Sequence, residues 1–177
     1  MKAGDYLFVG FGHNDEKADE GRYTNPNGNY LTEGSFANSL YVNYVKPAQE
    51  KGVTVVLCTP IVRRTATGIW EDSNLHITSD SGKFEGGNYA EAIRKMGEDL
   101  DITVVDMTTL TKNLYDELGV DETLNLHAWT SSSGTSVDNT HTNIYGARYN
   151  AYIDDKNIET NRIFRDFQNT LRRPKNR

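Results

Sequence analysis

Three short apolar runs, separated by helical segments, constrain the fold more than any other feature of this sequence. The runs are Tyr6–Val9, Val53–Cys58 and Ile102–Met107. Each is continuous rather than alternating, which is typical of parallel strands buried on both faces. Apolar residues recur with roughly a 3.6-residue period over 35–50 and 89–100, which predicts two intervening helices. The order predicts an α/β fold with a parallel sheet and right-handed crossovers.

Two further helices are expected towards the C-terminus. One covers 108–118 and ends at Gly119, in the position that favours glycine after a helix. The other runs on through Ile153, and either Thr142 or Asn143 would cap its first turn. We find no repeat or linker, so we expect one domain over 1–170 and a solvated basic tail over 171–177.

Composition excludes several classes of partner. The 25 acidic and 19 basic residues give a net charge of −6, which disfavours binding to nucleic acid or to an anionic membrane surface. No apolar run approaches the ~20 residues of a membrane span. A single cysteine, Cys58, excludes an internal disulfide and a cysteine-based zinc site. Without disulfides, the sequence leaves the cellular compartment of the protein undecided.

Polar residues directly after the first strand form a candidate site, Gly12-His13-Asn14-Asp15. A side-chain amide at the carboxyl end of a strand can donate to a developing oxyanion. The alternative is an ordinary turn, because Gly, Asn and Asp dominate turns for local reasons.

A second candidate is Asp138-Asn139-Thr140-His141, just before the last predicted helix. A carboxylate three residues before a histidine can reach its ring, fix the tautomer and stabilise the imidazolium while the other nitrogen acts as a base. The alternative is that Asp138 caps a loop and His141 is an ordinary surface residue.

Together the two segments resemble a known family. Residues 4–15 resemble the third signature block of the SGNH (GDSL-type) hydrolases, and Asp138–His141 resembles the fifth. Three segments are similar to the rhamnogalacturonan acetylesterase branch of that family: Gly12-His13-Asn14-Asp15, Thr59–Arg64 and Tyr145-Gly146-Ala147. The likeness runs from about Gly4 to Ile153.

The resemblance implies a flavodoxin-like three-layer α/β/α sandwich and a serine carbohydrate esterase that deacetylates rhamnogalacturonan or a related plant polysaccharide. It implies no metal and no other cofactor. It assigns Asn14 to the oxyanion hole, His141 as general base and Asp138 as the group that orients it. Gly12 would allow a tight turn beside the substrate, and His13 would pack or line the substrate. A polysaccharide substrate would suggest an exported parent protein.

The family's nucleophile block is missing, because no Gly-Asp-Ser occurs in this chain. The chain resembles the C-terminal two-thirds of an esterase, without the first two strands of the family's sheet. Ser35 follows the oxyanion segment and fits a helix cap instead. Other serines precede Asp138 with nothing to place them on a sharp turn, namely Ser131, Ser132, Ser133 and Ser136. We therefore expect no nucleophile here and negligible activity of the chain alone.

Without the first two strands, the strand at 6–9 would expose an apolar edge. Three explanations compete: a piece of a longer or split gene product, a truncated reading frame, or self-association, with a complementing chain at that edge.

Four further residues have competing interpretations. Arg63 and Arg64 follow the second strand and would bind an acidic sugar bidentately, or form a loop ion pair. His76 and His127 lack the spacing of metal ligands.

Two other interpretations compete with that of an esterase. One is a catalytically dead carbohydrate-binding or assembly module, which would bind acetylated pectin without releasing acetate. The other is a fragment that does not fold alone, which would show no cooperative melt.

Overall fold

The computed structural model describes residues 1–130 and 136–158, with the backbone alone described over 152–158. The chain forms two compact units, Met1–Val120 and Asp121–Arg177. The single domain expected over 1–170 stays a prediction, and the basic tail over 171–177 lies outside the described residues.

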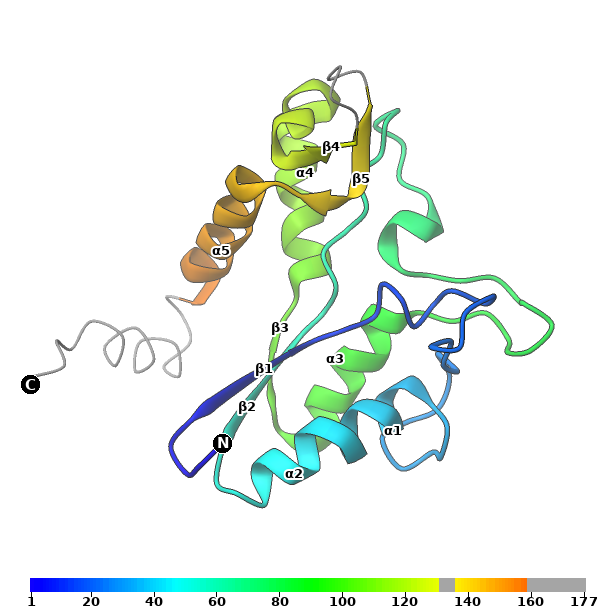
Figure 1. Cartoon of the computed structure of the whole chain (residues 1–177), viewed down its shortest axis with the longest axis vertical. Coiled ribbons are helices and arrows are strands. Elements are labelled where there is room, and N and C mark those ends of the chain that lie inside the picture. Colours follow the sequence, from blue (N-terminus) through cyan, green and yellow to red (C-terminus); the bar gives the residue numbers. More distant parts are fainter. Residues whose placement is uncertain (131–135, 159–177) are drawn as a thin grey trace, which may run out of the picture. The chain divides into compact units, whose positions relative to one another are not determined.

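The first unit contains a parallel three-stranded sheet in the order β1-β2-β3 (Figure 1). Its strands are β1 (Tyr6–Gly10), β2 (Thr54–Cys58) and β3 (Thr103–Val105). The register aligns Val9 with Leu57 of β2, and Leu57 with Val104 of β3. The predicted α/β class and parallel sheet are confirmed, consistent with a flavodoxin-like arrangement.

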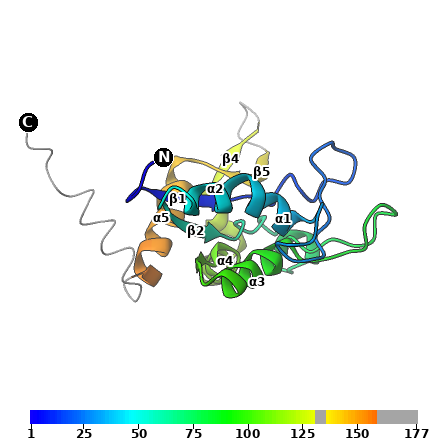
Figure 2. The same ribbon diagram turned by 90° about the horizontal axis from the view of Figure 1, so that it is seen from below.

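Helical elements connect these strands, and those over 36–49 and 89–100 lie where the sequence predicts them, whereas the turn over 72–75 was not predicted. They are α1 (Phe36–Leu40), the π-helical turn η1 (Tyr41–Val45), α2 (Lys46–Gln49), the 3₁₀ turn η2 (Asp72–Leu75) and α3 (Tyr89–Leu100). Ser35 caps α1, as expected, because its hydroxyl accepts the Asn38 N–H at 3.0 Å. α1 and α3 lie side by side in both views (Figures 1 and 2), and the rings of Phe36 and Tyr89 are 5.0 Å apart.

The core of the first unit lies between the sheet and these helices. Alternate residues of β1 and β2 enter it, because successive strand side chains point to opposite faces. These are Leu7, Val9, Val55 and Leu57. On β1, Phe8 remains 38% exposed, and β1 is at one end of the described sheet. Pairing of another chain along β1 stays a prediction.

The boundary between the units falls within α4 (Met107–Thr123), which is interrupted at Gly119 with φ 76°. The predicted end of a helix at Gly119 is therefore confirmed, although helical residues resume after it and continue to Thr123. The elements of the second unit are η3 (Leu124–Leu126), β4 (His127–Trp129), β5 (Val137–Thr142) and α5 (Ile144–Ile158). β4 and β5 are antiparallel. In the described part of the chain, no helix is both long and apolar enough to cross a membrane.

Candidate active site

A closed turn follows β1 and carries the first candidate segment. The Asp15 carboxylate accepts the Gly12 N–H at 3.1 Å, and the Asp15 N–H donates to the Gly12 carbonyl at 3.1 Å. Gly12 has a φ of 137°, and a Cβ there would lie 3.1 Å from the Pro60 ring. Both facts favour glycine, because side chains avoid this φ and this space. The predicted tight turn at Gly12 is present.

Asn14 projects from this turn. Its side chain is exposed, and its amide has no hydrogen-bond partner within residues 1–130 and 136–158. The turn interpretation therefore describes the backbone here, yet it leaves the amide of Asn14 available. An unengaged amide can donate to an anionic oxygen.

The buried ring of Tyr89, at the start of α3, anchors the same turn. Its hydroxyl lies 2.9 Å from the Asp15 carbonyl and 2.6 Å from the Thr24 carbonyl. The Thr24 N–H also donates to the Asp15 carbonyl, at 3.0 Å. Burial raises the pKa of the Tyr89 phenol, so it stays protonated as a donor. Sequence reasoning missed this anchor, because 74 residues separate Tyr89 from Asp15.

His13 points away from solvent towards the segment after β2. Its Nε2 lies 3.1 Å from the Ile61 carbonyl, so this nitrogen carries the proton. Burial, and then the neighbouring His76 and Arg63, lower the pKa of His13 to about 4. The ring is therefore neutral near pH 7. This fits the packing role assigned to His13, and substrate lining stays a prediction.

Both arginines of the segment Thr59–Arg64 bind groups of the protein itself. Arg63 pairs with the carboxylate of Glu16 and donates to the Ser73 carbonyl at 2.8 Å. Arg64 is 6% exposed and donates to the Val120 carbonyl at 2.8 Å. The structure thus shows the loop ion pair for Arg63. Binding of an acidic sugar by either residue stays a prediction.

A bulge in β5 holds the second candidate segment. Trp129 pairs with Val137, and His127 pairs with Thr142, so a step of two residues on β4 faces a step of five on β5. The surplus residues leave the ladder and re-aim their side chains, as bulges do.

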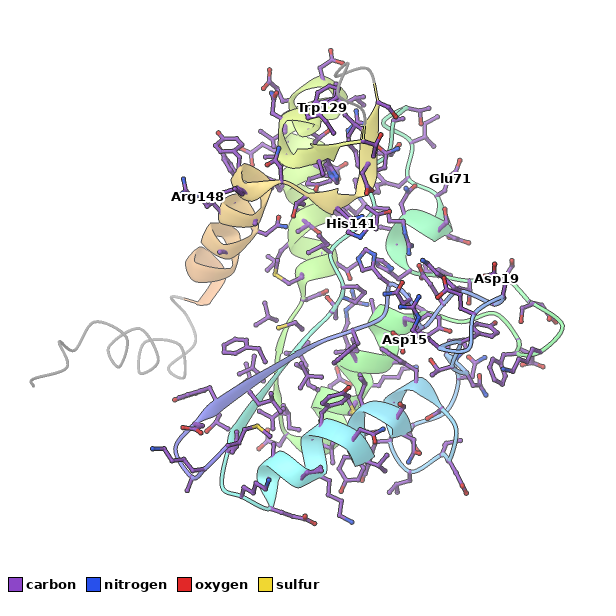
Figure 3. The ribbon with its side chains drawn as sticks, in the orientation of Figure 1. Asp15, Asp19, Glu71, Trp129, His141 and Arg148 are labelled. Atoms are coloured by element: carbon purple, nitrogen blue, oxygen red, sulfur yellow. The ribbon has the colours of Figure 1, made fainter. Side chains whose placement is uncertain are left out.

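Within the bulge, where Figure 3 labels His141, the side chains of Asp138 and His141 are directly hydrogen-bonded. The Asp138 Oδ2 lies 2.6 Å from the His141 Nδ1, while Oδ1 accepts the N–H groups of Thr140 at 2.7 Å and His141 at 3.0 Å. Burial opposes ionisation of Asp138, but these hydrogen bonds outweigh it and lower its pKa to about 2. The His141 side chain is 76% exposed. With Nδ1 held by the carboxylate, Nε2 is left facing outward as a base.

Two residues outside the motif hold this bulge in place. The His127 Nδ1 lies 2.8 Å from the Asp138 carbonyl. The Asn143 amide donates to the carbonyls of Asn125 and His127, each at 2.9 Å, and its oxygen accepts the Gly146 N–H at 2.9 Å. Asn143 is therefore the cap of α5, one of the two caps expected. The structural role of His127 had no signal in the sequence.

No metal cluster is assembled among the described residues. Residues 1–130 and 136–158 contain no group of three His, Cys, Asp or Glu side chains able to hold a metal. Ser35 caps α1, and Ser136 is exposed, with its carbonyl accepting the Thr130 N–H at 2.9 Å. The serines at 131–133 lie outside the described residues.

The chain is similar to two proteins of Bacillus subtilis, one in sequence and the other in fold. The chain is 30% identical over 164 residues to the rhamnogalacturonan acetylesterase RhgT of strain 168, covering 88% of this chain and 61% of that protein. The crystal structure of the protein YxiM superposes with a TM-score of 0.61 at 24% identity, covering 90% of this chain and 38% of that one. No protein-family model matches. The chain thus spans about three fifths of the length of the curated relative.

The sequence alignment and the fold comparison point to the same kind of protein. The RhgT alignment covers most of this chain, and the α/β fold with its parallel sheet matches that of YxiM. These likenesses in sequence and fold support the resemblance of the chain to the SGNH hydrolases of the rhamnogalacturonan acetylesterase branch.

Proposed function

We propose that this chain carries the general base and one oxyanion donor of a carbohydrate acetylesterase. Its substrate would be acetylated rhamnogalacturonan or a related plant polysaccharide, as the name of RhgT suggests. The observation that carries the proposal is the 2.6 Å contact between Asp138 and His141, with the histidine side chain 76% exposed.

In this mechanism, the Nε2 of His141 removes the proton from a serine hydroxyl as the oxygen attacks the acetyl carbonyl. Asp138 stabilises the imidazolium that forms. The amide of Asn14 donates to the tetrahedral oxyanion. The imidazolium then protonates the departing sugar oxygen, and a water molecule activated by the same base releases acetate.

The serine of this mechanism is not supplied by a Gly-Asp-Ser segment, because the sequence has none. We therefore expect the chain alone to release acetate negligibly, since acyl transfer needs the nucleophile. A base and an oxyanion donor without it can leave only residual rates over water.

The test begins with the chain alone. Acetate release from acetylated rhamnogalacturonan is measured together with intact mass after treatment with a fluorophosphonate probe. We expect no adduct and no release from a cooperatively folded chain. An adduct on one serine, lost in His141→Ala, would overturn the claim of a missing nucleophile, and peptide mapping would name that serine.

The roles of the base and donor are tested in a chimera. The part of RhgT before the residue that aligns with Gly4 of this chain is joined to the N-terminus of this chain. This added part is expected to supply the family's nucleophile block. Restored release that falls at least about 100-fold in His141→Ala and in Asn14→Ala supports the assignment. Restored release that ignores both substitutions refutes it.

A carbohydrate-binding or assembly module is the second candidate, favoured by the same missing Gly-Asp-Ser. Calorimetry with acetylated and deacetylated oligosaccharides tests it. Binding by the chain alone, combined with an inactive chimera, would favour the module over the esterase.

A further inference from the structure

A cluster of four ionisable side chains lies directly behind the turn that carries Asn14. It consists of His13, Glu16, Arg63 and His76, and we refer to it as the Glu16 cluster. The Glu16 side chain is 8% exposed and that of His76 is fully buried. The proposed mechanism uses none of these side chains for chemistry, so their burial calls for another explanation.

Glu16 is the centre of the cluster. One carboxylate oxygen pairs with the guanidinium of Arg63, and the other lies 3.3 Å from the Nδ1 of His76. A buried carboxylate is costly unless it is paired and hydrogen-bonded. Burial would raise the pKa of Glu16, but His76 and Arg63 outweigh it and lower that pKa. Glu16 is therefore charged at neutral pH.

Arg63 transmits this interaction to the turn. The guanidinium that pairs with Glu16 also donates to the His13 carbonyl at 3.3 Å and to the Ser73 carbonyl at 2.8 Å. The His13 carbonyl belongs to the peptide bond that leads into Asn14. Its orientation restricts the direction in which the Cα–Cβ bond of Asn14 leaves the backbone.

The two histidine rings anchor the cluster to the segment after β2. The Nε2 atoms of His13 and His76 lie 3.1 and 2.7 Å from the same Ile61 carbonyl, and the ring centroids are 4.5 Å apart. The turn after β1 is thereby held to the loop after β2 by groups other than Asn14.

We propose that Glu16, acting through Arg63 and His76, is a positioning residue that holds the Asn14 amide in its donating orientation. This inference rests on the proposed function of Asn14. It follows from a contrast within the turn: Asn14 has no side-chain hydrogen bond among the described residues, whereas the peptide bond before it is held by Arg63, which pairs with the nearly buried carboxylate of Glu16. Removal of Glu16 leaves the Arg63 guanidinium without its counter-charge and frees it to leave the His13 carbonyl.

The experiment compares two Glu16 variants with a matched control on the full chain. Glu16→Ala removes the carboxylate, and Glu16→Gln keeps its shape without its charge. Glu20→Gln is the control, because Glu20 lies four residues further along the same loop and pairs with Lys17 and Arg22 at the surface. Amide hydrogen exchange is read by NMR at Gly12 and Asp15, whose N–H groups close the turn. The Asn14 side-chain amide signals are followed in the same spectra.

We expect exchange at Gly12 and Asp15 to accelerate at least about tenfold in Glu16→Ala and less in Glu16→Gln, with shifted Asn14 side-chain signals. The control should stay within about twofold. Amides of β2 should be unchanged, which separates local loosening from global unfolding. If Glu16→Ala does not fold, Glu16→Gln decides. Unaltered exchange and Asn14 signals in the variants that fold overturn the inference.

Activity of the chimera separates this inference from the proposed function. If the chimera releases acetate, Glu16→Ala should lower kcat at least about tenfold with KM within about threefold, and Glu16→Gln should rescue part of the loss. An unchanged kcat in Glu16→Ala overturns the positioning role while the esterase stands. An inactive chimera counts against the esterase, and exchange still decides whether Glu16 holds the turn.

Discussion

The two candidate segments are built in opposite ways. The turn over Asp138–His141 is closed by its own atoms, with hydrogen bonds spanning two or three residues and the histidine 76% exposed. The turn over Gly12–Asp15 is closed locally as well, but it is held by side chains 50 to 74 residues away, Arg63 and Tyr89. The first turn depends mainly on sequence spacing, with a nearby anchor in His127, 11 residues away, whereas the second depends on side chains from distant parts of the fold.

The largest expected effect concerns the support of the second unit. A Cβ at Gly146 would lie 2.1 Å from the Leu126 carbonyl, so Gly146→Ala forces α5 away from η3. We expect a loss of about 3 kcal/mol or more in the free energy of unfolding. Ala147→Gly, at the next, exposed position, should cost about 1 kcal/mol. Urea titration measures both, and equal small losses would contradict the close approach.

Acid should separate the two segments. The folded-state pKa of His13 is about 4, below its ordinary 6.5, so the unfolded chain binds the proton first and stability falls between pH 6.5 and 4. The upper limit is about 3 kcal/mol at about 1.4 kcal/mol per pKa unit. The pKa of Asp138 is lowered from 3.8 to about 2, so the stability that this group contributes is present above pH 4 and is lost progressively as pH falls from about 4 to 2.

Unfolding of wild type and His13→Gln between pH 7 and pH 4 isolates the effect of His13. The groups that act on its ring are His76, Arg63 and Glu16, and all three remain in the variant. We expect the wild type to lose more stability than His13→Gln over this range. Parallel pH profiles would show that burial of His13 does not penalise its charge.

Removal of the distant anchor should loosen only the first turn. Tyr89→Phe deletes the hydroxyl that contacts the carbonyls of Asp15 and Thr24. We expect a loss of about 2 kcal/mol, because buried acceptors lose a donor. Hydrogen exchange should accelerate at Asp15 and stay unchanged at Thr140. Equal acceleration at both amides would mean that the two turns do not differ in their supports.

The substitution Asp138→Asn should change the chemical reactivity of His141 more than it changes the free energy of unfolding. The carboxylate is partly exposed, so we expect a loss of no more than about 1 kcal/mol. In the wild type, diethyl pyrocarbonate should modify His141 before the other histidines, since His76 and His127 are fully buried. Mass spectrometry reads the site, and faster modification of His127 would contradict the exposed base.

The smallest expected effect concerns β1. Phe8 is 38% exposed at one end of the described sheet, which favours pairing with a second copy. We expect weak, concentration-dependent dimers in sedimentation velocity, reduced by Phe8→Lys. A monomer at all concentrations would remove self-association as an explanation of that edge.

Local spacing determined much of this protein. The continuous apolar runs predicted the three strands, Ser35 and Gly119 marked helix ends, and the three-residue spacing of Asp138 and His141 predicted their contact. These features depend on interactions within a few residues, which sequence patterns report directly.

Only the tertiary structure decided the rest. It paired Arg63 with Glu16, buried His76 against Ile61, and placed Tyr89 and His127 as anchors of the two turns. Each of these contacts joins residues at least 11 positions apart. These contacts are stabilised because polar groups are buried together. Which groups meet depends on the distant segments that the core brings into contact, and local sequence spacing does not show this.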